Sequence, residues 1–333
     1  MKKILVLGAT GAMGKYLVPR LADMNCKVDA VALDKFPLEH PNINSIVTPN
    51  ARDGKYMLEL LANKYDGVVD FLVYNTELIT TFLPMMVENC GHYIYLSSYR
   101  VYDNKEIPIK ETSPRLCDTA DEQLIKLSDD YSIYKARGED VLKLLPQKNW
   151  TVIRPAITYS YLRNQLVTLE LHNTVGRAKQ GKTVVLPEEA RSVQATMSWG
   201  GDVAEMISKL LFNDKALAEV FTTSTAEHHT WEEVAGYYTE ICGLKPLWVP
   251  KDEYLGIVND FKYSNGSRWQ LECDRLFDRV IDNSKVLDAT GMKQADLMPL
   301  RKGLELEISK IPADFKWRPN ERMDNYLAKC GIK

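Results

Sequence analysis

Short, continuously apolar runs alternate with amphipathic stretches over the first 155 residues of this chain. Strands covered on both faces of a parallel sheet read as unbroken apolar runs, whereas helices carry apolar residues at a period of about 3.6. The alternation therefore predicts an α/β fold with a doubly wound parallel sheet. The expected strands are Ile4–Leu7, Val28–Leu33, Val68–Val73, Tyr93–Leu96 and Thr151–Ile153, and the expected helices are Tyr16–Met24, Lys55–Asn63, Leu78–Asn89 and Tyr131–Leu145.

The pattern loosens after Pro155, and the length of 333 residues suggests a second structural unit. We expect helices over Val167–Gln180, Asp202–Phe212, Thr230–Cys242 and Leu300–Ile311, and strands over Thr183–Leu186 and Val220–Thr223. The chain then divides by interleaving. Residues 1–157 and about 200–225 would form a nucleotide-binding domain, and residues 158–199 and 226–333 a smaller substrate-binding domain.

Composition excludes several classes of function. The chain carries 42 Lys and Arg against 45 Asp and Glu, a net charge of −3, so no basic field is available for nucleic acid or an anionic membrane. No run approaches the ~20 apolar residues of a membrane span. Six scattered cysteines are typical of reduced thiols, which indicates a cytoplasmic protein. His228 and His229 are adjacent, with no Cys or His at ligand spacing, so no metal is expected.

A glycine-rich turn joins the first expected strand to the first expected helix. It contains Gly8, Thr10, Gly11, Ala12, Met13 and Gly14. Glycines allow the backbone to approach a pyrophosphate, and a helix N-terminus offers unpaired N–H groups to it. Asp34 ends the second strand, where a carboxylate can accept hydrogen bonds from a ribose and would repel a 2′-phosphate. The pair predicts a Rossmann-type site for NAD rather than NADP.

A second phosphate motif, Gly176 to Thr183, matches G-x-x-x-x-G-K-[ST] literally. Such a loop follows a strand and opens a helix, whereas here an amphipathic stretch precedes the match and a strand follows it. We interpret the match as an exposed turn between helix and strand, and not as a nucleoside triphosphatase site.

Tyr131 and Lys135 are spaced to share one face of a helix. A free tyrosine has a pKa of about 10, so a neighbouring positive charge is needed for proton exchange at neutral pH. Ser98 ends the preceding strand and would lie at the carboxyl edge of the sheet, where ligands bind. The three side chains are therefore candidate catalytic residues.

In these motifs, and in Arg154-Pro155 and Gly201 to Ala204, the sequence resembles the extended short-chain dehydrogenase/reductase family of the NAD-dependent epimerase/dehydratase type. The resemblance implies that Ser98 holds the substrate oxygen, Tyr131 transfers the proton and Lys135 binds the nicotinamide ribose. It also implies that Asn50 and Ala51 lie by the adenine, that Pro155 lies by the nicotinamide, and that helices from Leu78 and Tyr131 form a homodimer.

The chain departs from the family pattern at several positions. Val73 and Tyr74 replace a usual small pair and would crowd the cofactor. Tyr99 and Arg100 replace the acidic pair of dehydratases, which disfavours a sugar 4,6-dehydratase, and Tyr99 would face substrate. The arginine that many nucleotide-sugar epimerases use is Ala195 here. A diphosphate clamp would then come from Arg191, Arg275 or Arg279.

The sequence thus predicts an NAD-dependent oxidoreductase or epimerase that transfers hydride at a hydroxyl-bearing carbon, with a sugar or nucleotide sugar as substrate. One alternative is an NAD(P)H-dependent alcohol or ketone reductase of a non-sugar small molecule. Residues 180–199 resemble the plastid RNA-binding branch of the superfamily, so a non-catalytic RNA-binding protein is the other. The near-neutral charge favours an enzyme with a small-molecule substrate.

Overall fold

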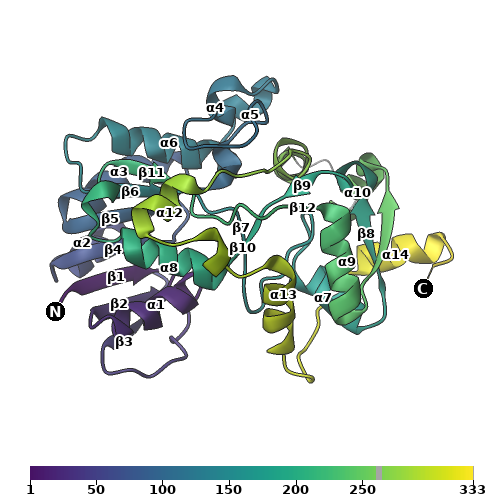
Figure 1. Cartoon of the computed structure of the whole chain (residues 1–333), viewed down its shortest axis with the longest axis horizontal. Coiled ribbons are helices and arrows are strands. Elements are labelled where there is room, and N and C mark those ends of the chain that lie inside the picture. The colour runs from purple at the N-terminus through teal and green to yellow at the C-terminus, as the bar shows by residue number, and fades with distance from the viewer. Residues whose placement is uncertain (260–264, 333) are drawn as a thin grey trace.

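A seven-stranded, fully parallel sheet forms one end of the molecule, and most of the later elements gather at the other end (Figure 1). The computed structural model describes residues 1–259 and 265–332. The strand order is β11-β6-β5-β4-β1-β2-β3, which confirms the predicted Rossmann-type sheet. Its strands are β1 (Lys3–Leu7), β2 (Lys27–Ala32), β3 (Ile43–Val47), β4 (Tyr65–Asp70), β5 (Cys90–Leu96), β6 (Trp150–Ile153) and β11 (Glu219–Phe221).

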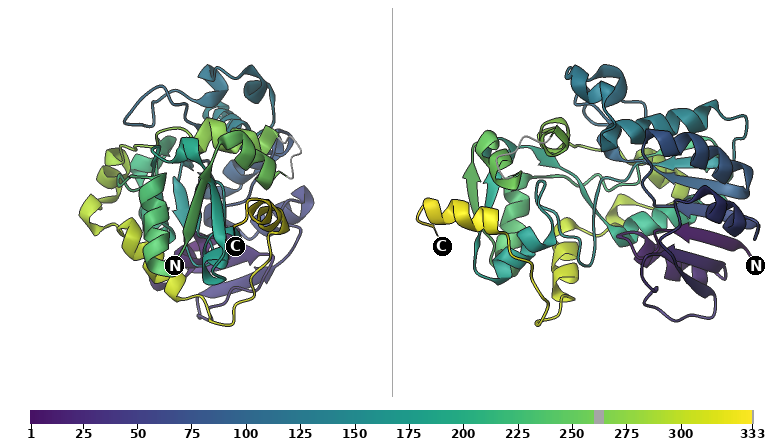
Figure 2. Two further views of the ribbon diagram at one scale, coloured as in Figure 1. Left: turned by 90° about the vertical axis from the view of Figure 1, so that its right-hand side faces the viewer. Right: turned by 180° about the vertical axis from the view of Figure 1, so that it is seen from behind.

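Helices cover both faces of the sheet, as its apolar strands require. Along β1, Ile4 and Val6 point to one face and Leu5 and Leu7 to the other, and all four are fully buried. The first face packs against α1 (Gly14–Asp23), α8 (Gly200–Leu210) and α12 (Ser284–Thr290). The second face packs against α2 (Gly54–Leu61), α3 (Thr76–Glu88) and α6 (Tyr131–Leu144), visible from behind in Figure 2.

The chain leaves the sheet after β6 and returns to it at β11. Three two-stranded pairs lie outside the sheet: β7 (Ile157–Tyr159) with β10 (Met197–Trp199), β8 (Thr183–Pro187) with β13 (Lys245–Val249), and β9 (Gln194–Ala195) with β12 (His229–Thr230). The helices around them are α7 (Val175–Lys179), α9 (Trp231–Cys242), α10 (Lys251–Val258), α11 (Asn265–Gln270), α13 (Leu300–Ser309) and α14 (Glu321–Lys329).

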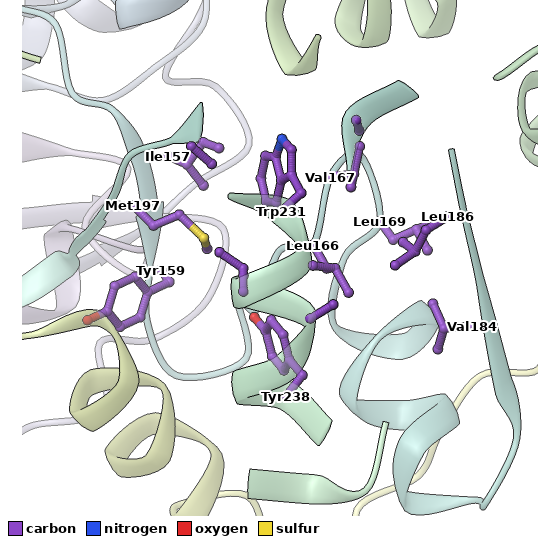
Figure 3. Close-up of a cluster of buried hydrophobic side chains, with 14 of the residues drawn as sticks. Ile157, Tyr159, Leu166, Val167, Leu169, Val184, Leu186, Met197, Trp231 and Tyr238 are labelled. Atoms are coloured by element: carbon purple, nitrogen blue, oxygen red, sulfur yellow. The ribbon is translucent and has the colours of Figure 1, made fainter. Parts of the chain in front are cut away.

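A second apolar core holds these later elements together (Figure 3). Trp231 and Tyr238 project from α9 into it, beside Leu166 and the β8 side chains Val184 and Leu186. Helix α9 begins at a capping box in which Thr230 and Glu233 exchange hydrogen bonds, which fixes its start where the sequence predicted it. Within the described residues, none of the helices combines the length and apolar character needed to span a bilayer.

Two expected elements differ from the structure. The Val68–Val73 strand ends earlier, at Asp70, because the Asp70 carboxylate accepts a hydrogen bond from the backbone N–H of Leu72 and turns the chain. The helix expected over Val167–Gln180 is wrong in its first half: Val167 adopts a positive φ of 52° inside a tight Leu166–Leu169 bridge. Only Val175–Lys179 is α-helical there.

The segment between Ser98 and Tyr131 adds two short helices beyond the predicted elements, α4 (Leu116–Thr119) and α5 (Gln123–Leu127). They pack with Ile133 of α6 and Trp269 of α11 in a small apolar cluster. The segment thereby joins the sheet-bearing end of the molecule to the later elements.

Candidate active site

A cavity of about 570 Å³ lies at the carboxyl edge of the sheet. Such a volume is typical of a small-molecule or cofactor site. Segments that follow β1, β2, β3, β4, β5 and β6 all line it, together with residues from the later elements. The glycine turn, Asp34, Ser98 and Tyr131, far apart in sequence, therefore share one cavity.

Two glycines of the glycine-rich turn have no room for a side chain or favour a backbone that only glycine adopts readily. A Cβ on Gly14 would lie 2.4 Å from the Ala9 carbonyl oxygen, and Gly8 has a φ of +75°, which favours glycine. Helix α1 begins at Gly14 without a side-chain cap or an acidic residue in its first turn. Lys15 and Tyr16 in the first turn donate their N–H groups to the Gly11 and Met13 carbonyls, whereas the Gly14 N–H makes no hydrogen bond within the described residues. That N–H is therefore open to an anionic ligand, and Thr10, Gly11, Ala12 and Met13 line the cavity beside it.

Two of the three residues expected near an adenosine line the cavity, and the third does not. Asp34 is exposed and lines the cavity after β2, and Ala51 lines it after β3. Asn50 is exposed, but it lies outside the cavity lining. Its neighbour Arg52, which the sequence analysis did not single out, does line the cavity.

The expectation that Tyr74 would crowd the cofactor is wrong. Val73 lines the cavity, but Tyr74 is fully buried and turned into the core, where its hydroxyl donates a 2.9 Å hydrogen bond to Asp70. Tyr93 donates a second 2.9 Å bond to the same oxygen. The buried carboxylate draws the tyrosine away from the cavity, so Tyr74 does not crowd a cofactor.

Ser98 and Tyr131 meet on the cavity wall. Tyr131 is the first residue of α6, which Asp130 caps by accepting a hydrogen bond from the Ser132 N–H. Burial raises the pKa of the Tyr131 hydroxyl, while the Arg100 guanidinium and a hydrogen bond with Ser98 act to lower it. The Arg100 guanidinium lies 5.1 Å from the Tyr131 ring centroid. This geometry suits a tyrosine that exchanges a proton with a ligand oxygen.

Lys135 lies one helical turn beyond Tyr131, fully buried and outside the cavity lining. Its Nζ donates a 2.5 Å hydrogen bond to the Leu96 carbonyl oxygen and lies 5.7 Å from the Tyr131 ring centroid. Burial lowers the pKa of Lys135 to about 8, against the opposing charge of Asp70. The lysine therefore supports the end of β5 from beneath Tyr131.

Pro155 and Tyr99 also line the cavity. Of the three arginines considered for a clamp, only Arg275 does so, and it donates to the Val167 carbonyl and the Tyr99 hydroxyl. Arg279 is buried and donates to the Tyr102 carbonyl, and Arg191 is exposed and pairs with Glu232. Neither lines the cavity.

Sequence reasoning missed Arg163, Gln165, Glu170 and Gln270, which also line the cavity. Arg163 and Gln165 lie in the irregular segment after β7, and Gln270 ends α11. No periodicity or motif marks these positions. Only their place in the folded chain brings them to the site.

The G-x-x-x-x-G-K-[ST] match has a structural role. It starts in helix α7 and ends in strand β8, and a Cβ on Gly176 would lie 2.7 Å from the Trp317 ring. Arg177 within it is buried and donates to the Thr183 carbonyl and to Asp324. The turn therefore packs against the C-terminal segment.

No metal centre is evident across residues 1–259 and 265–332: no three His, Cys, Asp or Glu side chains are grouped to hold an ion. His229 contacts Glu227 at 2.8 Å, and His228 contacts Gln194 at the same distance. The two histidines thus serve local packing.

Comparison with known proteins gives one family. The sequence profile described as "NAD dependent epimerase/dehydratase family" matches residues 4–221. No curated protein sequence matches the chain.

Solved structures share the fold at low sequence identity. An epimerase from Methanothermobacter thermautotrophicus is 15% identical, with a TM-score of 0.72 over 92% of this chain and 91% of that chain. The UDP-glucose 4-epimerase of Thermus thermophilus, in complex with NAD, is 17% identical, with a TM-score of 0.69 over 94% and 100%. The UDP-glucuronic acid 4-epimerase of Bacillus cereus, in complex with UDP-glucuronic acid and NAD, is 16% identical, with a TM-score of 0.67 over 92% and 98%.

Proposed function

Because the chain belongs to the NAD-dependent epimerase/dehydratase family, we propose that it transfers hydride at a hydroxyl-bearing carbon of a sugar or nucleotide sugar. The observation that carries the proposal is the meeting of Ser98 and Tyr131 in the cavity that the glycine turn also lines. A proton-transfer group and a pyrophosphate turn in one cavity are the two parts that a nicotinamide-dependent reaction at a carbinol needs.

The residues at the sheet edge fit NAD. The turn around Gly11 and Gly14 would hold the pyrophosphate, Asp34 the adenosine ribose, and Ala51 and Pro155 would lie along the two ends of the cofactor. When bound, NAD supplies the hydride acceptor and donor. An exposed carboxylate at Asp34 disfavours a 2′-phosphate, so the site favours NAD over NADP.

Tyr131 and Ser98 would bind the same substrate oxygen, since both residues line the cavity and Ser98 acts to lower the pKa of the Tyr131 hydroxyl. Ser98 would orient that oxygen, and Tyr131 would take its proton when the carbon is oxidised and return it when the carbon is reduced. The positive charge of Arg100 beside Tyr131 favours the tyrosinate that holds this role between proton transfers.

A sugar substrate is supported by the polar side of the cavity. Gln165, Glu170 and Gln270 present amide and carboxylate groups, the partners that sugar hydroxyls require. Similarity to the Thermus and Bacillus cereus 4-epimerases supports a nucleotide sugar. Epimerisation uses oxidation and re-reduction at one carbon, so the cofactor stays bound through the cycle.

We further propose that the protein is a cytoplasmic homodimer. All six cysteines are free thiols, in keeping with a reducing compartment. Helices α3 and α6 pack side by side on one face of the sheet and would form the shared surface. Light scattering coupled to size exclusion measures the assembly, and a monomeric mass at micromolar concentration would contradict it.

The catalytic assignment is tested by Tyr131→Phe in an assay for nucleotide-sugar epimerisation. Loss of the hydroxyl should lower kcat by ~10²-fold or more while NAD still binds. Tyr134→Phe is the matched control, because Tyr134 lies 5.5 Å from the Tyr131 ring but does not line the cavity. Full turnover by Tyr131→Phe would refute the assignment.

Cofactor retention separates the two enzymatic alternatives. An epimerase should co-purify with NAD, because the cofactor is regenerated within each cycle. A reductase of a non-sugar ketone releases its cofactor after each turnover, so nucleotide-free protein with NADH-dependent ketone reduction would favour that alternative.

A further inference from the structure

The cavity is positively charged although the chain is slightly acidic. Its lining includes four arginines, Arg52, Arg100, Arg163 and Arg275, against two carboxylates, Asp34 and Glu170. Asp34 and Arg52 follow β2 and β3, on the side assigned to the adenosine. The excess positive charge therefore falls on the other side, where Arg100, Arg163 and Arg275 face Glu170.

The partners of these three arginines differ. Arg275 is neutralised, since its guanidinium contacts Asp274 and donates to the Tyr99 hydroxyl. Arg100 approaches Asp274 only at 3.4 Å and Asp130 at 3.6 Å. Charge-assisted hydrogen bonds are usually about 2.7–2.9 Å long, so these contacts leave Arg100 incompletely paired. Asp274 is also shared with Arg279, at 3.2 Å.

In the part of the chain that the structure describes, Arg163 has no counter-ion. Within the described residues, its exposed side chain makes no hydrogen bond and no ion pair, although it lines the cavity. Its backbone is nevertheless firmly placed, because Ser160 and Arg163 exchange two hydrogen bonds, of 3.1 and 2.9 Å, across a tight turn. Lys15, in the first turn of α1, anchors the same turn through the Tyr161 carbonyl at 2.9 Å.

Both cations lie near the reacting position. The Arg100 guanidinium lies 5.1 Å from the Tyr131 ring centroid, and Arg163 lines the same cavity as Tyr131 and Arg100, where its charge acts to lower the Tyr131 pKa. A group bound by both would therefore lie beside the carbon whose hydroxyl meets Tyr131. A diphosphate attached to the far side of a sugar ring does not meet this condition, whereas a carboxylate on the neighbouring carbon does.

We propose that Arg100 and Arg163 form a subsite for a substrate carboxylate next to the reacting carbon, so that the preferred substrate is a uronic-acid type of nucleotide sugar. The inference rests on the proposed function and narrows its substrate class. Glu170 does not cancel the subsite, because within the described residues it forms no ion pair with Arg100 or Arg163, and its carboxylate is held by a 2.7 Å hydrogen bond from Gln165. A guanidinium pair matches the geometry of a carboxylate.

The test is calorimetric binding of UDP-glucuronate and UDP-glucose to NAD-loaded Tyr131→Phe protein, in which turnover is blocked. The two ligands differ only at C6 of the sugar, which is a carboxylate in UDP-glucuronate and a hydroxymethyl group in UDP-glucose. We expect UDP-glucuronate to bind at least ~10-fold more tightly. Arg163→Gln should weaken UDP-glucuronate ~10-fold to 100-fold and leave UDP-glucose nearly unchanged. Arg163 has no partner among the described residues that the substitution would strand, so the variant should fold.

Arg191→Gln is the matched control, because it removes an exposed arginine that does not line the cavity. Equal affinity for the two ligands, or binding of neither, would overturn the subsite. An equal loss of both ligands in Arg163→Gln would also overturn it and assign Arg163 to the shared diphosphate. Turnover by the wild-type enzyme is measured separately, so a failure of the proposed reaction is distinct from a failure of the carboxylate preference.

Discussion

Replacing Lys135 with methionine should stabilise the folded protein, although Lys135 lies beneath Tyr131, to which we assign the proton transfer. The side chain is fully buried, and burial lowers its pKa to about 8 from an ordinary value of 10.5. The pKa difference, about 2.5, corresponds to about 3 kcal/mol of folding free energy lost at neutral pH. Removing the ammonium removes that cost.

The substitution also removes a favourable contact. The 2.5 Å hydrogen bond from Nζ to the Leu96 carbonyl would be lost, at a cost of about 1 kcal/mol. Methionine is unbranched and adaptable, so it should fill most of the vacated space. The net expected gain in the free energy of unfolding is therefore about 2 kcal/mol at pH 7.

The sign of the pH dependence is fixed by the direction of the pKa shift. Between about pH 8 and pH 10.5 the unfolded chain binds more protons at Lys135 than the folded chain does, so wild-type stability rises with pH in that window. The destabilisation is complete below about pH 8 and is lost as pH approaches 10.5. The advantage of Lys135→Met should thus shrink by about 1 kcal/mol between pH 7 and pH 9.

Urea unfolding of nucleotide-free protein, followed by tryptophan fluorescence at pH 7 and pH 9, measures both quantities. Lys143→Met is the matched control on the same helix, since Lys143 is largely solvent-accessible and its replacement should change stability by no more than about 0.5 kcal/mol. The reasoning is refuted if Lys135→Met is less stable than the wild type at pH 7, or if the difference between them does not change with pH.

Two further substitutions test the cofactor site. Asp34→Ser should reduce the preference for NAD over NADP, because the carboxylate that repels a 2′-phosphate is lost. Thermal-shift titrations with both nucleotides measure this preference. An unchanged preference would show that Asp34 does not contact the ribose. Gly14→Ala should abolish NAD binding or unfold α1, because its Cβ would lie 2.4 Å from the Ala9 carbonyl oxygen. Gly236→Ala in α9 is the matched control, because a Cβ at that position would meet no atom within 4 Å. Its melting temperature should stay the same or rise. Equal behaviour of the two glycine variants would contradict the steric argument.

Local pattern was sufficient for most strands of the sheet. Continuous apolar runs located β1, β2, β5 and β6, because strands buried on both faces tolerate few polar side chains. The same logic missed β3, an edge strand whose residues Asn44 and Ser45 interrupt the run. Glycines at a strand end and a tyrosine opening a helix could be placed because their roles depend on the backbone that carries them.

Side-chain direction at a strand end could not be predicted in this way. Tyr74 follows β4 by four residues, and its orientation depends on Asp70, a buried carboxylate that needs hydrogen-bond donors. Asp70 gains them from Tyr74 and Tyr93, and the second of these lies on the neighbouring strand. The hydrogen bonds to Asp70 turn Tyr74 away from the cavity, and the positions of Tyr74 and Tyr93 in the sequence do not show that they share this carboxylate.

The sequence also could not show which arginine would lie unpaired at the cavity. Arg163, Arg191, Arg275 and Arg279 are equivalent as sequence letters, and each could hold an anion. In the folded chain Arg191 pairs with Glu232, and Arg275 and Arg279 share Asp274. Arg163 alone of the four keeps its charge uncompensated among the described residues, and it does so at the cavity. A charge that the fold leaves unpaired is free to bind a ligand anion, so the substrate class that we propose rests on the partners of the arginines and not on their number.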